Sequence, residues 1–304
     1  MKALKLATRK SRLALWQSEF VASALRQAHA GLEVDLVPMS TRGDEVLDRS
    51  LAEIGGKGLF LKELESALLD RRADIAVHSL KDVPAESPAG LVLAAVLPRA
   101  DWSDLWIDAG GVAPWQMPPG SKVGTSSLRR QSQLLRAWPH LQVVPVRGNV
   151  ETRLGLLHSG RVDAVILAAA GIDRLDIALS HRRVLGPPEF LPAPGQGVIV
   201  IQCREDDGEI MRLLEAVHCP ATQQRVSAER GVVAALGGDC RMPLAALAEL
   251  TDGSLNLRAR LASPDGQECL DAMATGSAKE ASALGRQVAS ALLDQGALRL
   301  LSHL

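Results

Sequence analysis

The sequence predicts an α/β fold made of two similar α/β lobes, followed by a small α+β domain. Short apolar segments alternate with segments of helical periodicity as far as about residue 215, which is typical of α/β folds. The same series starts again after a Gly/Pro-rich loop at 110–120, and the pattern changes at about residue 221. These observations together predict two or three domains within the 304 residues.

The first lobe is predicted from short apolar runs and from amphipathic spacing between them. Its expected strands are 4–8, 32–40 and 73–79, its expected helices are 11–29 and 58–72, and an apolar stretch follows at 91–107. A later segment, LPAPGQGVIVIQCR (191–204), combines a Pro/Gly-rich piece with a strand-like run. It is well placed to return the chain to the first lobe, which would give a hinge of two segments.

The second lobe repeats this series. Its expected strands are 122–126, 142–146 and 162–168, and its expected helices are 128–138 and 149–160. Residues 56–77 and 147–167 share one pattern, in which a basic residue, a glycine and an amphipathic helix precede Arg-x-Asp and an apolar strand. Two similar lobes would explain this repeat, although two ordinary strand–helix–strand units could also look alike by chance.

The third domain has a different composition of elements. A helix at 221–236 precedes strands at 243–250, 254–261 and 267–274 with Asp-Gly turns, and a helix at 278–296 closes the chain. We therefore predict lobe 1 at 1–98 with 197–216, lobe 2 at 102–193, and the α+β domain at 218–304.

Composition narrows the class of protein. The net charge of −1 argues against a nucleic-acid binder defined by bulk charge, and no apolar run reaches the roughly 20 residues of a membrane span. The N-terminus shows no signal-peptide pattern. The four cysteines form no Cys-x-x-Cys pair, so neither a zinc site nor a disulfide framework is expected. We expect a cytoplasmic protein without a metal.

Basic residues occur at three places where a strand leads into a helix. Arg9 and Ser11 lie in ATRKSR, Ser127 with Arg129 and Arg130 in GTSSLRRQ, and Arg147 with Arg153 in VRGNVETR. The helix dipole disfavours cations at such a helix start, whereas free N–H groups, hydroxyls and guanidinium groups together suit an anion. Any single arginine could instead be solvated or paired with Asp or Glu. Three such junctions favour a polyanionic ligand.

Two further features carry chemistry. Lys81 and Asp82 end the strand-like segment VHSLKDVP, where ligands of open α/β sheets bind, and a carboxylate there could move a proton or stabilise positive charge. The alternative is a surface ion pair. Cys240 lies in the glycine loop GGDCRMP. A lone intracellular cysteine is usually a small buried hydrophobe, but glycines build turns at a surface or cleft.

Several of these motifs occur together in one known family. HSLKDVP, GTSSLRRQ, RGNVETRL, LPAPGQG and AERGVVAALGGDCRMP, in this order, resemble porphobilinogen deaminase (hydroxymethylbilane synthase) from about Leu6 to the last helix. The resemblance implies two periplasmic-binding-protein-like lobes around a cleft and an α+β domain that bears one functional cysteine. It implies a monomeric, cytoplasmic transferase of tetrapyrrole and haem biosynthesis, which binds no nucleic acid or membrane and joins four porphobilinogen molecules head to tail.

The resemblance also assigns the site. Cys240 would attach a dipyrromethane cofactor through a thioether, and Asp82 would be the catalytic carboxylate. Contacts to cofactor or substrate would come from Arg9, Ser11, Lys81, Ser127, Arg129, Arg130, Arg147, Arg153 and Arg174. The acetate and propionate groups of each pyrrole match the polyanion that the arginine junctions predict. Coupling after loss of ammonia also places positive charge on pyrrole nitrogens, which a carboxylate can stabilise.

We expect the arginines to divide their roles. Arg129 and Arg130 would hold the carboxylates of the cofactor, and Arg147 and Arg153 would serve its assembly or the early additions. Arg9 would act mainly on the incoming monomer or the nascent chain. Two residues depart from the family pattern, Asp239 before the cysteine and Met242 after it. A carboxylate beside the thiol should raise its pKa and slow the loading of the cofactor.

Two other classes of protein share parts of this pattern. A solute-binding or ligand-sensing protein can have a two-lobed fold, but it would need an export signal or a DNA-binding module, and neither is evident. A phosphoribosyltransferase would explain the anion sites but would give Cys240 no role.

Overall fold

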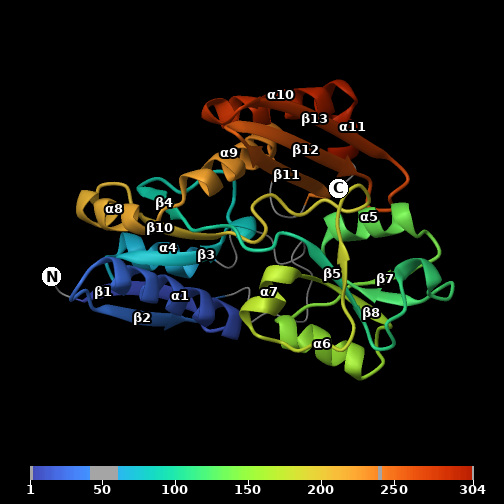
Figure 1. The fold of residues 1–304 in the computed structure, drawn as a ribbon, viewed down its shortest axis with the longest axis horizontal. Helices are drawn as coiled ribbons and strands as arrows, with labels where there is room; N and C mark the ends of the chain where they lie inside the picture. The colour runs from blue at the N-terminus through green and yellow to red at the C-terminus, as the bar shows by residue number, and fades with distance from the viewer. Residues whose placement is uncertain (1–2, 42–60, 239–241, 303–304) are drawn as a thin grey trace. The chain divides into compact units, whose positions relative to one another are not determined.

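The computed structural model describes residues 3–41, 61–238 and 242–302 (Figure 1). The first residues of the helix predicted at 58–72 and the cysteine Cys240 lie outside the described ranges. The chain forms two compact units, Met1–Ala100 with Val198–Gln223 and Asp101–Gly197 with Gln224–Leu304. The second lobe and the C-terminal domain thus share one unit, and their finer division remains a prediction.

The first unit contains a five-stranded mixed sheet. Its order is β2-β1-β3-β10-β4, with β1, β2 and β3 parallel and β10 antiparallel to both of its neighbours. The strands are β1 (Leu4–Arg9), β2 (Val34–Met39), β3 (Ile75–Ser79), β4 (Leu91–Val96) and β10 (Ile199–Arg204). The segment that contains β10, far later in the chain, therefore contributes an interior strand to the first sheet, between β3 and the edge strand β4.

Helices cover both faces of this sheet because the strand side chains alternate. Leu6 faces α1 (Arg12–Ala28) and α8 (Gly208–Leu214), in a core that also includes Val21 and Leu213. Ala7 faces the opposite side and packs with α4 (Lys62–Leu69). The helix α1 begins after Ser11, whose hydroxyl accepts a hydrogen bond from the Ala14 backbone N–H.

The second unit contains a sheet with the same topology. Its order is β7-β6-β8-β5-β9, with β6, β7 and β8 parallel and β5 antiparallel to β8 and β9. The strands are β5 (Asp104–Asp108), β6 (Lys122–Gly124), β7 (Gln142–Val144), β8 (Ala164–Ala168) and β9 (Arg183–Leu185). On one face lies α5 (Leu128–Ala137), and on the other α6 (Val150–His158) and α7 (Ala169–Arg174).

This topology confirms the internal repeat. The two repeated segments form α4 with β3 and α6 with β8, and β3 and β8 both occupy the central position of their sheets. In each sheet the central strand also pairs with an antiparallel strand. This is β10, from later in the chain, beside β3, and β5, from earlier in the chain, beside β8. The similarity in sequence is therefore a similarity in structure and not a coincidence.

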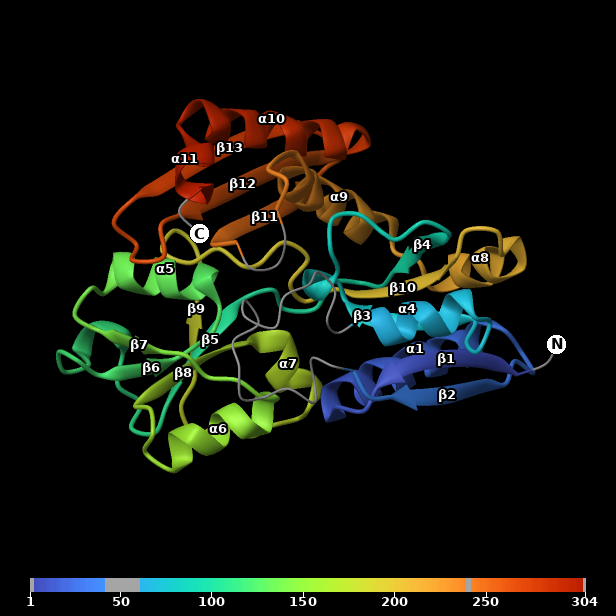
Figure 2. The same cartoon turned by 180° about the vertical axis from the view of Figure 1, so that it is seen from behind.

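The C-terminal part of the second unit is an antiparallel three-stranded sheet covered by helices. The strands β11 (Leu244–Thr251), β12 (Ser254–Ala262) and β13 (Cys269–Ser277) follow one another, and α10 (Ala281–Asp294) lies along the sheet in both views (Figures 1 and 2). The predicted Asp-Gly turn forms at Asp252 and Gly253, both with positive φ. Helix α9 (Pro220–Ala235) packs closely on α10 at Gly285. A Cβ at this position would lie only 2.4 Å from the Ala228 carbonyl oxygen, so the close approach requires glycine.

The structure also contains short elements that the pattern did not predict. They are α7, α8, β9 and α11 (Ala297–Leu301). The strand β9 has three residues and α7 is the small-residue segment AAGIDR, so neither is long enough to show a period. Among the described residues, no helix is long and apolar enough to cross a membrane.

Candidate active site

The carboxyl ends of the parallel strands bring the predicted residues of the first unit together. Arg9 is the last residue of β1, and the 3₁₀ turn Leu80–Asp82 directly follows the neighbouring strand β3. Parallel strands end at the same edge of a sheet, so Arg9, Ser11, Lys81 and Asp82 share one edge. The Leu80 backbone N–H donates to the Val198 carbonyl oxygen at 3.0 Å, which fixes the turn that carries Lys81 and Asp82.

A buried polar chain lies within the sheet behind this edge. The Nε2 of His78 is 3.1 Å from the Oε1 of Gln202, and the Gln202 amide donates to Glu65 at 3.3 Å. Burial lowers the pKa of His78 to about 4, which outweighs the hydrogen bond to Gln202, and the charge of Arg9 lowers it further. His78 is therefore uncharged at neutral pH. It lies within the buried strand β3.

The corresponding edge of the second unit collects the remaining predicted residues. Arg129 and Arg130 lie in the first turn of α5 after β6, Arg147 follows β7, and Arg174 ends α7 after β8. Ser127 is the N-cap of α5, and its hydroxyl accepts from the Arg130 backbone N–H at 3.4 Å. The three strands are parallel neighbours, so these residues again share one sheet edge.

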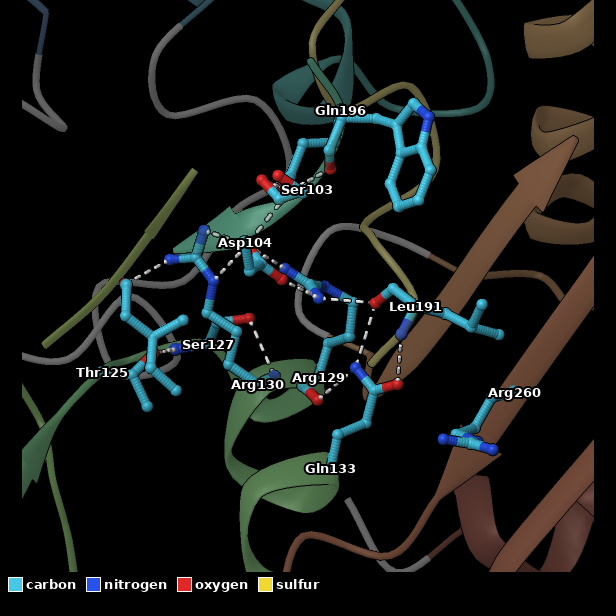
Figure 3. Close-up of polar contacts among 12 residues, drawn as sticks. Ser103, Asp104, Thr125, Ser127, Arg129, Arg130, Gln133, Leu191, Gln196 and Arg260 are labelled. Carbon is cyan, nitrogen blue, oxygen red and sulfur yellow. Dashed lines mark hydrogen bonds and ion pairs between the residues drawn. The ribbon is translucent and has the colours of Figure 1, made fainter. Parts of the chain in front are cut away.

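Asp104 lies between the guanidinium groups of Arg129 and Arg130 (Figure 3). Its Oδ2 accepts from Arg129 Nη1 at 2.7 Å, and its Oδ1 accepts from Arg130 Nη2 at 2.7 Å and Nε at 3.0 Å. Asp104, Arg129 and Arg130 are only 1%, 4% and 5% exposed. Burial alone would raise the pKa of Asp104, but the two arginines hold it well below its ordinary value.

The expected contact of Arg129 and Arg130 with carboxylates of the cofactor stays a prediction. The anion that both contact in the structure is Asp104, which belongs to the chain itself. The reason is that Asp104 begins the antiparallel strand β5 opposite Ala168, so its side chain lies at the carboxyl edge of β6 and β8. The suggestion that an arginine at a junction is paired with Asp therefore holds for these two.

Asp104 satisfies neither all the N–H donors nor the whole positive charge of Arg129 and Arg130. A guanidinium has five N–H groups, and Arg129 donates three hydrogen bonds, two to the Asp104 carboxylate and one to the Leu191 carbonyl oxygen. The Nε of Arg129 is buried and has no hydrogen-bond partner. One carboxylate against two cations also leaves one net positive charge. A net positive charge of this kind favours an anion nearby, and a ligand that carries carboxylates would supply one.

The other arginines of this edge contact the backbone. Arg153 Nε donates to the Gly148 carbonyl oxygen at 3.0 Å, and Arg174 Nη2 donates to the Gly197 carbonyl oxygen at 2.8 Å. Burial lowers the pKa of Arg174 to about 10, so it remains a cation at neutral pH. Helix α6 begins after Asn149, whose side chain accepts from the Thr152 backbone N–H.

Cys240 lies between α9 and β11, outside the described residues. On its N-terminal side Gly237 has a φ of 65°, which favours glycine, and a Cβ on Gly238 would lie 2.1 Å from the Met242 sulfur. Met242 packs against the core of the C-terminal sheet and helices. Gly237 thus allows the positive φ, and Gly238 leaves room for the Met242 side chain. The expected effect of Asp239 on the pKa of the thiol stays a prediction.

The predicted residues therefore form one group in each unit. Sequence reasoning missed Asp104, Gln133 and Gln196, which form hydrogen bonds around Arg129 and Arg130. It also missed Glu229, which accepts from the Gly195 N–H. A signal for Asp104 existed, because an acidic residue at the start of the apolar run DLWID is unusual. Glu229 lies inside the motif AERG and Gln196 inside LPAPGQG, so both belong to motifs of the family pattern without being singled out by it.

The described residues form an α/β protein with two sheets of the same topology and a buried cationic cluster at the edge of the second. Residues 4–212 match the family model "Porphobilinogen deaminase, dipyromethane cofactor binding domain", and residues 223–294 match "Porphobilinogen deaminase, C-terminal domain". Curated porphobilinogen deaminases of Xanthomonas euvesicatoria pv. vesicatoria (strain 85-10) and Xanthomonas axonopodis pv. citri (strain 306) are each 52% identical over 304 residues, 100% of either chain. The chain belongs to the porphobilinogen deaminase family.

Solved structures of other proteins are more distantly similar. The Bordetella pertussis BvgS periplasmic VFT2 domain has 16% identity and a TM-score of 0.43, over 71% of this chain and 86% of that chain. The "Ancestral Cationic Amino Acid Solute Binding Protein (AncCDT-1)" has 15% identity and a TM-score of 0.45, over 71% of this chain and 88% of that chain.

Membership of the family confirms the predicted class of protein. The chain is a transferase of tetrapyrrole biosynthesis, a hydroxymethylbilane synthase, with a periplasmic-binding-protein-like α/β fold and a C-terminal domain. Its cofactor is dipyrromethane, and attachment through Cys240 fits the family.

Proposed function

We propose that the two groups of residues divide the work of the family reaction. Arg129, Arg130, Arg147, Arg153 and Arg174, together with Ser127, hold carboxylates of the dipyrromethane attached at Cys240. Arg9, Ser11 and Lys81 bind the incoming porphobilinogen, and Asp82 is the catalytic carboxylate. The observation that carries this proposal is the buried cluster of two arginines with one aspartate, whose net positive charge favours a further anion.

The chain's own residues then have defined tasks. When bound, the dipyrromethane supplies a free pyrrole carbon to which the first substrate is joined. When porphobilinogen loses its amine as ammonia, Asp82 stabilises the positive charge on the pyrrole nitrogen. After the new C–C bond has formed, Asp82 takes up the proton that leaves the attacking ring carbon, which restores the aromatic pyrrole. Its place at the carboxyl end of β3, on a turn fixed by the Leu80–Val198 hydrogen bond, supports this role. The arginines keep the acidic side chains of the pyrroles in register.

We further propose a monomeric, cytoplasmic enzyme that acts on a small molecule and binds no nucleic acid. The net charge of −1 supports the absence of a nucleic-acid surface. The described cysteines Cys203, Cys219 and Cys269 form no disulfide, which suits a reducing compartment. Light scattering on the purified chain should give the mass of one copy, and a dimer mass would contradict the proposal.

Intact-mass measurement tests the assignment of the site. The wild-type chain should exceed its sequence mass by one dipyrromethane unit, and Cys240→Ser should lack this increment. Asp82→Asn should keep the increment and lose about 10²–10⁴-fold in turnover, the usual contribution of one positioned acid–base group.

Either of two results would overturn the assignment. Active wild-type enzyme with the bare sequence mass would remove the attachment at Cys240. A loss below about tenfold in Asp82→Asn would make Asp82 only a surface partner of its neighbours.

A further inference from the structure

One short segment is hydrogen-bonded both to the Asp104–Arg129–Arg130 cluster and to the elements α9 and β11, which flank Cys240 in the sequence. This segment is Leu191–Gly197, the LPAPGQG motif, and it directly precedes β10. The Leu191 carbonyl oxygen accepts from Arg129 Nη1 at 2.7 Å and from Gln133 Nε2 at 3.0 Å, and the Leu191 N–H donates to Gln133 Oε1 at 2.8 Å (Figure 3). The start of the segment is therefore fixed to α5.

Gln196 fixes the other end of the segment to the same cluster. Its Nε2 is 3.0 Å from Asp104 Oδ1, 2.7 Å from the Trp102 carbonyl oxygen and 3.2 Å from the Ser103 carbonyl oxygen. Gln196 is fully buried. Because Asp104 also accepts from Arg129 and Arg130, a shift of Gln196 would act on the anchor of both arginines.

The middle of the segment is held by the C-terminal part of the unit. Glu229, in α9, accepts from the Gly195 N–H at 2.7 Å with Oε2 and from the Ala248 N–H at 2.8 Å with Oε1. The Ala246 N–H donates to the Pro192 carbonyl oxygen at 3.1 Å. Both Ala246 and Ala248 belong to β11, so Glu229 joins α9, β11 and the segment at one buried carboxylate.

These contacts have a consequence for the cofactor. Helix α9 ends at Ala235 and β11 begins at Leu244, so the two elements that Glu229 ties together flank the chain that carries Cys240. We propose that Glu229 and Gln196 are positioning residues, which use the 191–197 segment to set the base of the cofactor attachment relative to Arg129 and Arg130. This inference rests on the proposed function, because it assumes that the cofactor at Cys240 meets these arginines.

A purely structural role makes a different prediction. If Glu229 only stabilised the fold, a variant would load cofactor as well as any other variant of equal stability. If it positions the attachment, loading should suffer far beyond the loss of stability, since a misplacement of 1 Å can cost about 10²-fold in rate.

The test compares Glu229→Gln with a control of matched stability. Glutamine keeps the shape of the side chain but turns one acceptor into a donor, which faces a backbone N–H. Val288→Ala removes packing from the core of the same C-terminal elements and contacts neither the segment nor the cluster. Full-length apo-chains are supplied with porphobilinogen, and the appearance of the dipyrromethane increment is followed by intact mass beside the melting temperature.

We expect Glu229→Gln to gain the increment about 10–100-fold more slowly than Val288→Ala at a similar melting temperature. Gln196→Met, which has similar volume, should show the same defect, and it serves as the second variant if Glu229→Gln does not fold. Equal loading rates in the stability-matched variants would overturn the inference. If instead the wild-type chain never gains the increment, the proposed function itself fails, and the positioning roles of Glu229 and Gln196 fall with it.

Discussion

Replacing Asp104 by Asn tests whether the buried arginine cluster needs its internal anion. The substitution keeps the size of the side chain and removes only the negative charge and part of its accepting capacity. Arg129 and Arg130 are 4% and 5% exposed, so water cannot take the place of the carboxylate. Two buried cations would then share one neutral oxygen.

The magnitude follows from this burial. Removal of one partner of a buried ion pair typically costs about 3–5 kcal/mol, because it leaves an uncompensated charge. For a unit of this size, each kcal/mol corresponds to roughly 2–4 °C in melting temperature, so the loss should be about 6–20 °C. Asp173→Asn is the control, since its pair with Arg182 is about half exposed on both sides and should contribute at most ~1 kcal/mol.

Tryptophan fluorescence during urea unfolding of the apo-chain measures both variants. Trp102, Trp106, Trp115 and Trp138 lie in the second unit and only Trp16 in the first, so the signal reports mainly on the unit that contains Asp104. A cost of less than about 1 kcal/mol for Asp104→Asn, or one equal to that of Asp173→Asn, would refute the account of the cluster.

Two further predictions concern pH and packing. Because the pKa of His78 is about 4 in the folded chain and about 6.5 when unfolded, the unfolded state binds more protons between these values. Stability should therefore fall as the pH falls, by about 2 kcal/mol more in the wild type than in His78→Gln between pH 7 and 5; parallel losses in urea titrations followed by circular dichroism would contradict this. Gly285→Ala should destabilise by about 1–3 kcal/mol, because its Cβ would meet the Ala228 carbonyl oxygen at 2.4 Å. Gly155→Ala, in α6 with open space around it, should stabilise by about 0.4–1 kcal/mol, and thermal melts that rank the two variants the other way would show the packing to be wrong.

The sequence allowed the larger elements and the grouping of the cationic residues to be predicted. Long amphipathic helices such as α1 and α10 have a clear helical period, and strands such as β3 and β8 are short continuous apolar runs. The order of these elements implies which strand ends share an edge. Short elements such as β9 and α7 have too few residues for a period and form because their neighbours pair with or cover them.

The partners of the predicted residues were harder to foresee. Asp104 is 25 and 26 positions from the arginines that it contacts, and only the antiparallel pairing of β5 with β8 brings it to them. Glu229 reaches Gly195, 34 positions away, through the packing of α9. Such contacts depend on tertiary structure, whereas the helix-start arginines could be found from local pattern alone.

The placement of β10 in the first sheet affects the order in which the chain can fold during synthesis. Strand β4 lies at the edge of that sheet and is hydrogen-bonded to β10, which is made only after the whole of 101–197. The second sheet, in contrast, draws all its strands from the continuous stretch Asp104–Leu185. Domains made first usually fold first on the ribosome. Here the lobe that is made second can complete its sheet while the earlier lobe still lacks its interior strand β10.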